Sequence, residues 1–328
     1  MREPNGQTLT GGKRRGWLRW AQWVVAGGLI VVLIRVVGLR ELALKLSGLD
    51  LRWVLATTGL SLFLLALGGV NVWLLLRALA PVKLGDYLPA YVLGWAAGLV
   101  VPGQIGDATQ VLLLRARGVA VSGSAAAYAL DKGVTLVVFL LVAVAGGARY
   151  LDPTHARLSG VALMGAVVVG VGALGLILVW RAARSRGRLG RVAAALCRVL
   201  ENMLSFRRRP LCVARNGALT VGKWVVMAAC YYAAFRAVGA EISATAAGVI
   251  PVMSTLVGYL PVTAGGIGTV EWSAVFLFGR AGTPESVVVA AYVLLRLVQY
   301  TIALPLAVLA TRRMASAERS CPSTREPT

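Results

Sequence analysis

Charged residues are scarce in this chain of 328 residues. Asp, Glu, Lys and Arg together make up 14% of the sequence, whereas hydrophobic residues make up 58%. A water-soluble domain usually carries about 25% charged residues. The composition therefore excludes an ordinary soluble protein, and the excess of apolar residues predicts a chain that is embedded in lipid.

Histidine and paired cysteines are also nearly absent. The chain has one histidine, His155, and four cysteines without CxxC spacing, at positions 197, 212, 230 and 321. This pattern argues against histidine triads, zinc sites and a disulfide framework, and we expect no cofactor and no metal. Phosphate-loop, HExxH, GxSxG and dinucleotide motifs are missing as well. We therefore expect that the chain is not an enzyme acting on soluble substrates.

Long apolar runs are what the sequence has in abundance. A straight helix needs about 20 apolar residues to cross the hydrocarbon core of a bilayer. Six runs satisfy this requirement, at 20–38, 53–76, 120–146, 158–180, 216–238 and 284–310. The first follows a basic stretch but has no convincing cleavage site, which favours a retained span. The sequence predicts an all-α polytopic membrane protein with about six full transmembrane helices.

Two further apolar regions are broken in the middle. Region 88–118 is broken at Pro102-Gly103-Gln104-Ile105-Gly106, and region 244–280 is broken by Pro261 and by Gly265-Gly266-Ile267-Gly268. Proline and clustered glycines end helices, so each region is expected to form two half-helices. We interpret each pair as a re-entrant hairpin; short, tilted crossings remain the alternative.

The basic residues indicate how the chain is oriented. If both hairpins are re-entrant, one face collects 23 of the 34 Lys and Arg residues, and the opposite loops hold six. This bias is typical of cytoplasmic loops, so the net charge of +21 does not indicate a nucleic-acid partner. We expect a cytoplasmic N-terminus (1–19), one domain (20–310) in a bacterial-type inner membrane, and a cytoplasmic polar tail (311–328).

One basic segment has helical periodicity of its own. Within 188–206, leucine, valine and methionine side chains recur at helical spacing, with arginines between them. Two interpretations remain open. The segment is either a helix that lies on the anionic surface of the inner leaflet or a cytoplasmic helix that packs on the bundle.

The two broken regions resemble each other. Ile105-Gly106, Gly118, Tyr128 and Lys132 are matched by Ile267-Gly268, Gly282, Tyr292 and Arg296, at an offset of 162 residues at first and 164 later. We interpret this as an internal repeat with units at about 53–146 and 216–310, joined through 147–215. On the expected topology the repeat is inverted, as in many secondary transporters.

The repeat places charges deep in the bilayer. Lys132 and Arg296 lie near the middle of their runs, where an uncompensated charge costs about 2.5–3.5 kcal/mol. Asp107, Glu271 and Asp131 are the candidates to compensate them, and purely structural ion pairs are one interpretation. In the other, Lys132 and Arg296 join the N–H groups of the glycine breaks in holding an anionic headgroup such as phosphate. The candidate substrate-binding residues are Gly103, Gly106, Asp107, Asp131, Lys132, Gly265, Gly266, Gly268, Glu271 and Arg296.

These motifs resemble a known family. Pro102 to Asp107, Tyr128-Ala-Leu-Asp131-Lys132, and Gly265 to Gly268 with Glu271 and Arg296 are similar to the flippase-like membrane domain of lysylphosphatidylglycerol synthases. Stand-alone members of that family include YbhN-like and HpnL-like membrane proteins. The likeness covers about residues 20–310. One departure is that the family more often has a Glu-Arg pair where Asp131-Lys132 stands.

The resemblance implies a class of activity. It implies a lipid flippase or transporter that moves an anionic lipid or a lipid-linked precursor across the inner membrane. The expected partners are anionic or phosphate-bearing membrane lipids, together with lipid-modifying enzymes or glycosyltransferases. The alternative is an intramembrane enzyme, or the partner of an enzyme, that acts on polyprenyl-phosphate-type lipids, with Asp107 and Glu271 as its acid and base groups.

Overall fold

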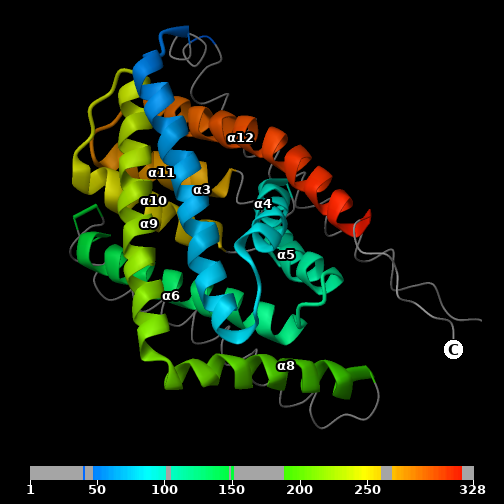
Figure 1. Ribbon diagram of the computed structural model, residues 1–328. Coiled ribbons are helices and arrows are strands. Elements are labelled where there is room, and N and C mark those ends of the chain that lie inside the picture. The colour runs from blue at the N-terminus through cyan, green and yellow to red at the C-terminus, as the bar shows by residue number, and fades with distance from the viewer. Residues whose placement is uncertain are drawn as a thin grey trace, which may run out of the picture.

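The computed structural model describes residues 40, 47–100, 105–147, 149–150, 188–259 and 268–319, and all secondary structure in these ranges is helical (Figure 1). The elements are α3 (Leu51–Leu79), α4 (Leu84–Val100), α5 (Ile105–Ala116), α6 (Val121–Gly147), α8 (Arg188–Ser205), the 3-10 turn η2 (Phe206–Arg208), α9 (Pro210–Ala237), α10 (Ala244–Gly258), α11 (Thr269–Arg280) and α12 (Glu285–Arg319).

Four of these helices are long and apolar enough to cross a membrane. They are α3, α6, α9 and the part of α12 from Glu285 to Ser316. They correspond to four of the six expected spans, and the other two, 20–38 and 158–180, lie outside the described residues. Helix α9 begins six residues before its apolar run because Pro210 at the first helical turn favours initiation.

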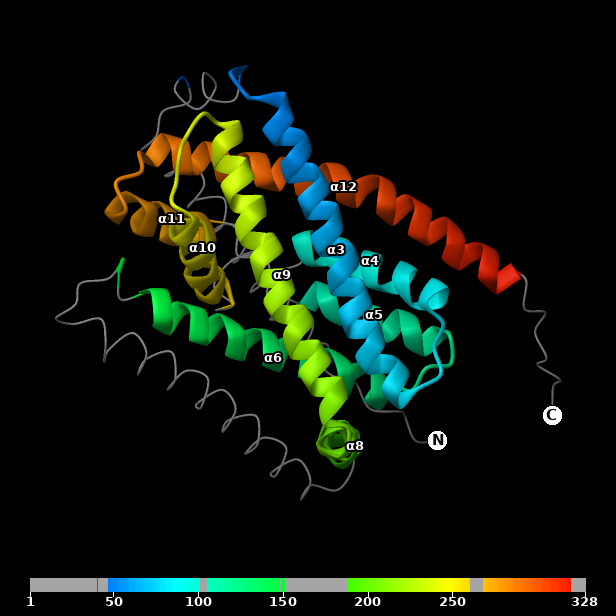
Figure 2. The same ribbon diagram turned by 60° about the vertical axis from the view of Figure 1, so that its left-hand side comes forward.

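Helices α3 and α9 form an antiparallel pair at the centre of the fold (Figures 1 and 2). At one end the N–H of Asp50 donates to the carbonyl of Ala237 at 3.0 Å. At the other end Leu79 and Cys212 belong to the same hydrophobic cluster. Helix α12 runs across the pair near the end where α3 begins, and α6 crosses nearer the end where α9 begins.

Described connecting segments meet in two places. Arg117 forms an ion pair with Asp86 at 3.5 Å, which brings segments 77–87 and 115–119 together. At the second place the hydroxyl of Tyr150 donates to Thr245 at 3.3 Å, so the residues that follow α6 approach the start of α10.

Each broken region forms two short helices, as expected. Helix α4 packs on α5, and α10 packs on α11. The breaks themselves, 101–104 and 260–267, lie outside the described residues. The helices on the two sides of each break therefore confirm that each region forms two helices and not one.

The segments that follow the two breaks have the same architecture. Helices α5 and α11 each have 12 residues, and both they and the following helices start 164 positions apart. The turns that follow α5 and α11 each contain a glycine with positive φ, Gly118 at 79° and Gly282 at 83°. The next N–H returns to the helix in both cases, from Val119 to the carbonyl of Leu114 (3.1 Å) and from Thr283 to that of Phe278 (2.9 Å). This is the Schellman arrangement, which favours glycine at the turn.

The expected amphipathic helix is present as α8, and it ends one residue earlier than predicted. It lies across the lower end of α9 in Figure 1 and is seen end-on in Figure 2. It packs against α6, and Phe206, directly after it, is buried in the cluster that contains Leu79. Its leucines at 196, 200 and 204 stay exposed, one helical turn apart. Helix α8 therefore packs on the bundle and also has an apolar stripe that faces outward.

Candidate functional site

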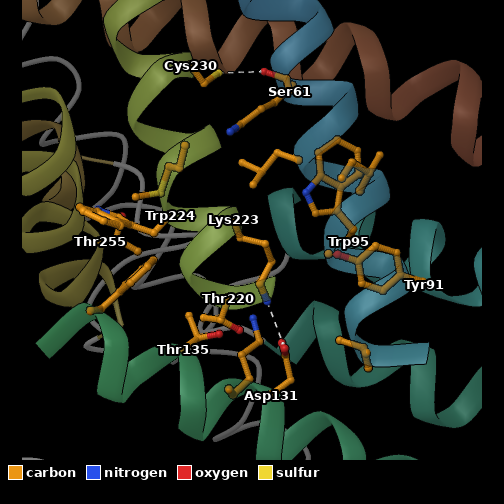
Figure 3. Close-up of a pocket in the computed structure, with 18 of the residues that line it drawn as sticks. Ser61, Tyr91, Trp95, Asp131, Thr135, Thr220, Lys223, Trp224, Cys230 and Thr255 are labelled. Carbon is orange, nitrogen blue, oxygen red and sulfur yellow. Dashed lines mark hydrogen bonds and ion pairs between the residues drawn. The ribbon is translucent and has the colours of Figure 1, made fainter. Parts of the chain in front are cut away.

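A cavity of about 350 Å³ lies between the long helices. Side chains from α3, α4, α5, α6, α9, α10 and α12 line it, and Figure 3 shows several of them pointing into the same space. Its hydroxyl and amide groups come from Ser61, Gln110, Thr135, Thr220, Thr255 and Gln299, and its aromatic rings from Tyr91, Trp95, Tyr128, Phe139, Trp224 and Tyr231. The cavity can thus surround a polar group of moderate size within a largely apolar bundle.

A network of hydrogen bonds surrounds the carboxylate of Asp131, which lies on α6 and lines the cavity. Its Oδ1 atom accepts from the side-chain amides of Asn71 (2.9 Å) and Asn216 (3.0 Å). The same atom accepts from Nζ of Lys223 at 3.0 Å, a pair that Figure 3 marks with a dashed line. The Asn71 amide also donates to the Thr220 hydroxyl at 3.2 Å. This network joins α6 to both members of the α3–α9 pair.

A second cation lies beside this network. Lys132 lines the cavity, and its Nζ atom lies 5.3 Å from the centre of the Tyr128 ring. Among the described lining residues, two lysines therefore accompany one carboxylate. The cavity lining thus offers two ammonium groups, and ammonium groups are the kind of donor that binds an anionic ligand.

Glu271 and Arg296 form a separate cluster at the second break. The Nε–H of Arg296 donates to one carboxylate oxygen of Glu271 at 3.0 Å, and the N–H of Gly268 donates to the other at 2.7 Å. The carboxylate thus compensates Arg296 and caps the start of α11. The expected pairing of Glu271 with Arg296 is confirmed, and the ion pair is largely buried.

The candidate residues from the sequence divide into three groups. Asp131 and Lys132 line the cavity. Gly268, Glu271 and Arg296 form the cluster beside it, since Leu295 and Gln299 of the cavity wall flank Arg296 on α12. Gly103, Gly265 and Gly266 lie outside the described residues, and Gly106 and Asp107 are described only as backbone of α5. Among the described residues, the structure brings Lys132 together with Lys223 in the cavity lining, whereas Arg296 lies outside that lining.

The sequence prediction missed the contribution of α9. Asn216, Thr220 and Lys223 are separated by four and three positions, which places them on one face of a helix. Such a polar face within an apolar run is a signal that could have identified them. Asn71 on α3 contributes to the same network through its contacts with Asp131 and Thr220.

The fold and the cavity define a helical membrane protein with a polar site, lined by two lysines and one aspartate, between its helices. The chain belongs to the lysylphosphatidylglycerol synthase TM region family, whose model matches residues 19–307. This confirms the resemblance seen in the sequence and gives the chain a membrane function related to lipid. The comparison with curated proteins gave no match.

Proposed function

We propose that the chain is a lipid flippase that moves the anionic headgroup of a lipid, or of a lipid-linked precursor, across the membrane through this cavity. The observation that carries the proposal is the pair of lysines, Lys132 and Lys223, which line one cavity from helices that are both long enough to span a bilayer. Ionisable groups within transmembrane helices mark substrate pathways in membrane proteins.

The proposed topology has six full spans, two re-entrant hairpins and an inverted repeat. It is supported by the constant 164-residue offset of α5–α6 and α11–α12 and by the antiparallel packing of α3 with α9, the helices that precede each broken region. In such transporters the two repeat units move against each other around a site between them. Lys132 and Lys223 come from different units of this proposed repeat.

The proposed membrane is a bacterial-type inner membrane, with both termini in the cytoplasm. The support is the excess of Lys and Arg on the loops that group with the N-terminus. Enzymes that modify lipid headgroups or transfer sugars to lipids are the proposed partners.

The rival function is an intramembrane enzyme, or the partner of an enzyme, that acts on a polyprenyl-phosphate-type lipid with Asp107 and Glu271 as acid and base groups. The side chain of Asp107 lies outside those the structure describes. The geometry favours the transporter, because both oxygens of Glu271 already accept hydrogen bonds, from Arg296 and from the N–H of Gly268. A carboxylate held in this way serves as a helix cap and as the partner of a buried cation.

The test is leaflet exchange of a fluorescent phosphatidylglycerol in proteoliposomes, with dithionite to quench the outer leaflet. We expect faster exchange than in empty liposomes, and a reduction of about tenfold for Lys132→Ala and for Lys223→Ala, because each charged hydrogen bond contributes about 1.5 kcal/mol or more. Lys83→Ala, at an exposed position before α4, is the matched control and keeps the wild-type rate.

Two other results would contradict the proposal. If exchange across several anionic lipids is no faster than in empty liposomes, the flippase assignment is wrong. If mass spectrometry instead shows that the protein changes the mass of a polyprenyl-phosphate lipid, the enzyme is the better assignment.

A further inference from the structure

The three donors around Asp131 differ in how freely they can leave it. Asn71 and Asn216 are buried, and their short side chains are fixed to α3 and α9. Lys223 reaches the same oxygen at the end of a four-carbon chain and also lines the cavity. Lys223 can therefore turn toward a ligand without movement of its helix, whereas the two amides stay with the carboxylate.

An anion in the cavity competes with Asp131 for Lys223. When the ammonium group turns to a phosphate, the Asp131 carboxylate loses its counter-charge in a place where it is 5% exposed. A buried, unpaired carboxylate is strongly unfavourable and tends to become neutral by taking up a proton. Ligand binding at Lys223 is thus linked to the protonation of Asp131.

The surroundings of Asp131 also supply what a protonated carboxyl group needs. A neutral carboxyl group has an O–H donor that requires an acceptor. The amide oxygens of Asn71 and Asn216 are buried and accept no hydrogen bond. Rotation of either amide about its last bond exchanges its nitrogen for this oxygen, which then accepts from the carboxyl O–H. The two amide oxygens are therefore acceptors that a protonated Asp131 can reach.

From this geometry we infer that the cavity takes up one proton, on Asp131, together with each anionic headgroup that binds Lys223. The inference rests on the proposed function and deepens it: the protein couples headgroup movement to proton movement. In the step itself, Asp131 gains a proton from water, the Lys223–Asp131 ion pair separates, and a Lys223–phosphate ion pair forms. A proton suits the site better than a metal ion because amide N–H groups already point at the carboxylate.

Other titratable groups also face this space. Lys132 and Tyr128 lie on α6, Tyr91 on α4, and Cys230 and Tyr231 on α9, and all five line the cavity. Of the described acidic side chains, Asp131 is the one in the lining. The side chain of Asp107 on α5 is not among those described. Among the titratable side chains of the lining, a carboxylate is the kind of group that gains a proton when a cation leaves it. The variant Asp131→Asn removes this carboxylate and leaves the other titratable side chains in place.

The experiment measures proton uptake when the purified protein binds a lipid. Dihexanoyl phosphatidylglycerol is added to the full chain in detergent, in weakly buffered solution near pH 7 with an indicator dye, and binding is measured in parallel. The phosphodiester stays singly charged at this pH, so it takes up no proton itself. We expect uptake of about one proton per bound lipid.

Variants assign the proton to Asp131. Asp131→Asn should bind lipid without proton uptake. Lys223→Gln, measured at lipid concentrations that restore binding, should also take up no proton per bound lipid, because it has no ion pair with Asp131 that a headgroup can separate. This variant decides the matter if Asp131→Asn fails to fold. Glu241→Gln changes an exposed carboxylate, paired with Arg236, that lies outside the cavity lining, and it should keep the wild-type ratio.

The outcomes separate this inference from the proposed function. If the wild type binds and exchanges lipid without proton uptake, or if Asp131→Asn keeps the full uptake, the coupling is wrong and the flippase assignment stands. If the wild type neither binds nor exchanges lipid, the proposed function fails and the coupling fails with it.

Discussion

Gly268 shows how a single residue holds the second break in place. Its φ of 87° lies in a region that residues with a Cβ atom avoid, and its N–H donates to the carboxylate of Glu271. That carboxylate in turn holds Arg296. The backbone conformation of one glycine therefore helps to determine where a buried cation is compensated.

The first prediction follows from this conformation. We expect Gly268→Ala to destabilise the protein by about 1–2 kcal/mol, because a Cβ atom is strained at this φ. The measurement is the thermal unfolding midpoint in detergent. Gly217→Ala is the control: that glycine lies within α9 with open space around it, so alanine there should be neutral or stabilising. Equal midpoints for the two variants would mean that the strain is absent.

The charged residues of the site could be predicted from the sequence, but their pairing could not. Asp131, Lys132, Glu271 and Arg296 are recognisable because charged residues within apolar runs are rare. The contact of Lys223 with Asp131 is not, since it joins positions 92 residues apart. Tertiary packing determines which faces of two helices meet. The spacing of residues along one helix contains no information about the helix that packs against it.

At the scale of the elements, the half-helices were predictable and their packing was not. Proline and glycine clusters ended the helices as expected, and helix lengths follow such local signals. The contact between α6 and α10 depends on Gly146, where a Cβ atom would lie 2.3 Å from a methyl group of Val249. In the sequence Gly146 is one glycine among 38, so its role emerges only from the packing.

The second prediction tests this contact. We expect Gly146→Ala to cost about 1–3 kcal/mol, the usual effect of overpacking a well-packed contact. Gly133→Ala, on the same helix with no atom within 4 Å of its added Cβ, is the matched control and should unfold at or above the wild-type temperature. The two variants are compared by thermal unfolding in the same detergent. A wild-type midpoint for Gly146→Ala would show that α6 and α10 can separate easily.

At the scale of the whole molecule, the two ends of the α3–α9 pair should face different compartments. The hydrogen bond between Asp50 and Ala237 places the start of α3 beside the end of α9. Segment 77–87 lies at the opposite end, where Asp86 meets Arg117. Because basic residues concentrate in segments such as 77–87 and 181–215, the proposed topology expects this second end in the cytoplasm.

The third prediction is therefore topological. Alkaline phosphatase, which is active only outside the cytoplasm, should be active when it is inserted at Glu241 and inactive when it is inserted at Lys83. A fluorescent protein that matures only in the cytoplasm should give the reverse result at the same two positions. If both positions give the same result, the proposed crossing of α3 and α9 is wrong.

The long separation between Asp131 and Lys223 also affects how the chain is made. A ribosome adds about 5–20 residues per second, so α6 is synthesised about 5–20 s before the lysine that pairs with its aspartate, 92 positions later. During that interval Asp131 lacks its cation. We therefore expect the release of α6 into lipid to be delayed until α9 is made. A nascent chain that stops before α9 would keep Asp131 in the bilayer without Lys223, and quality-control proteases should remove it.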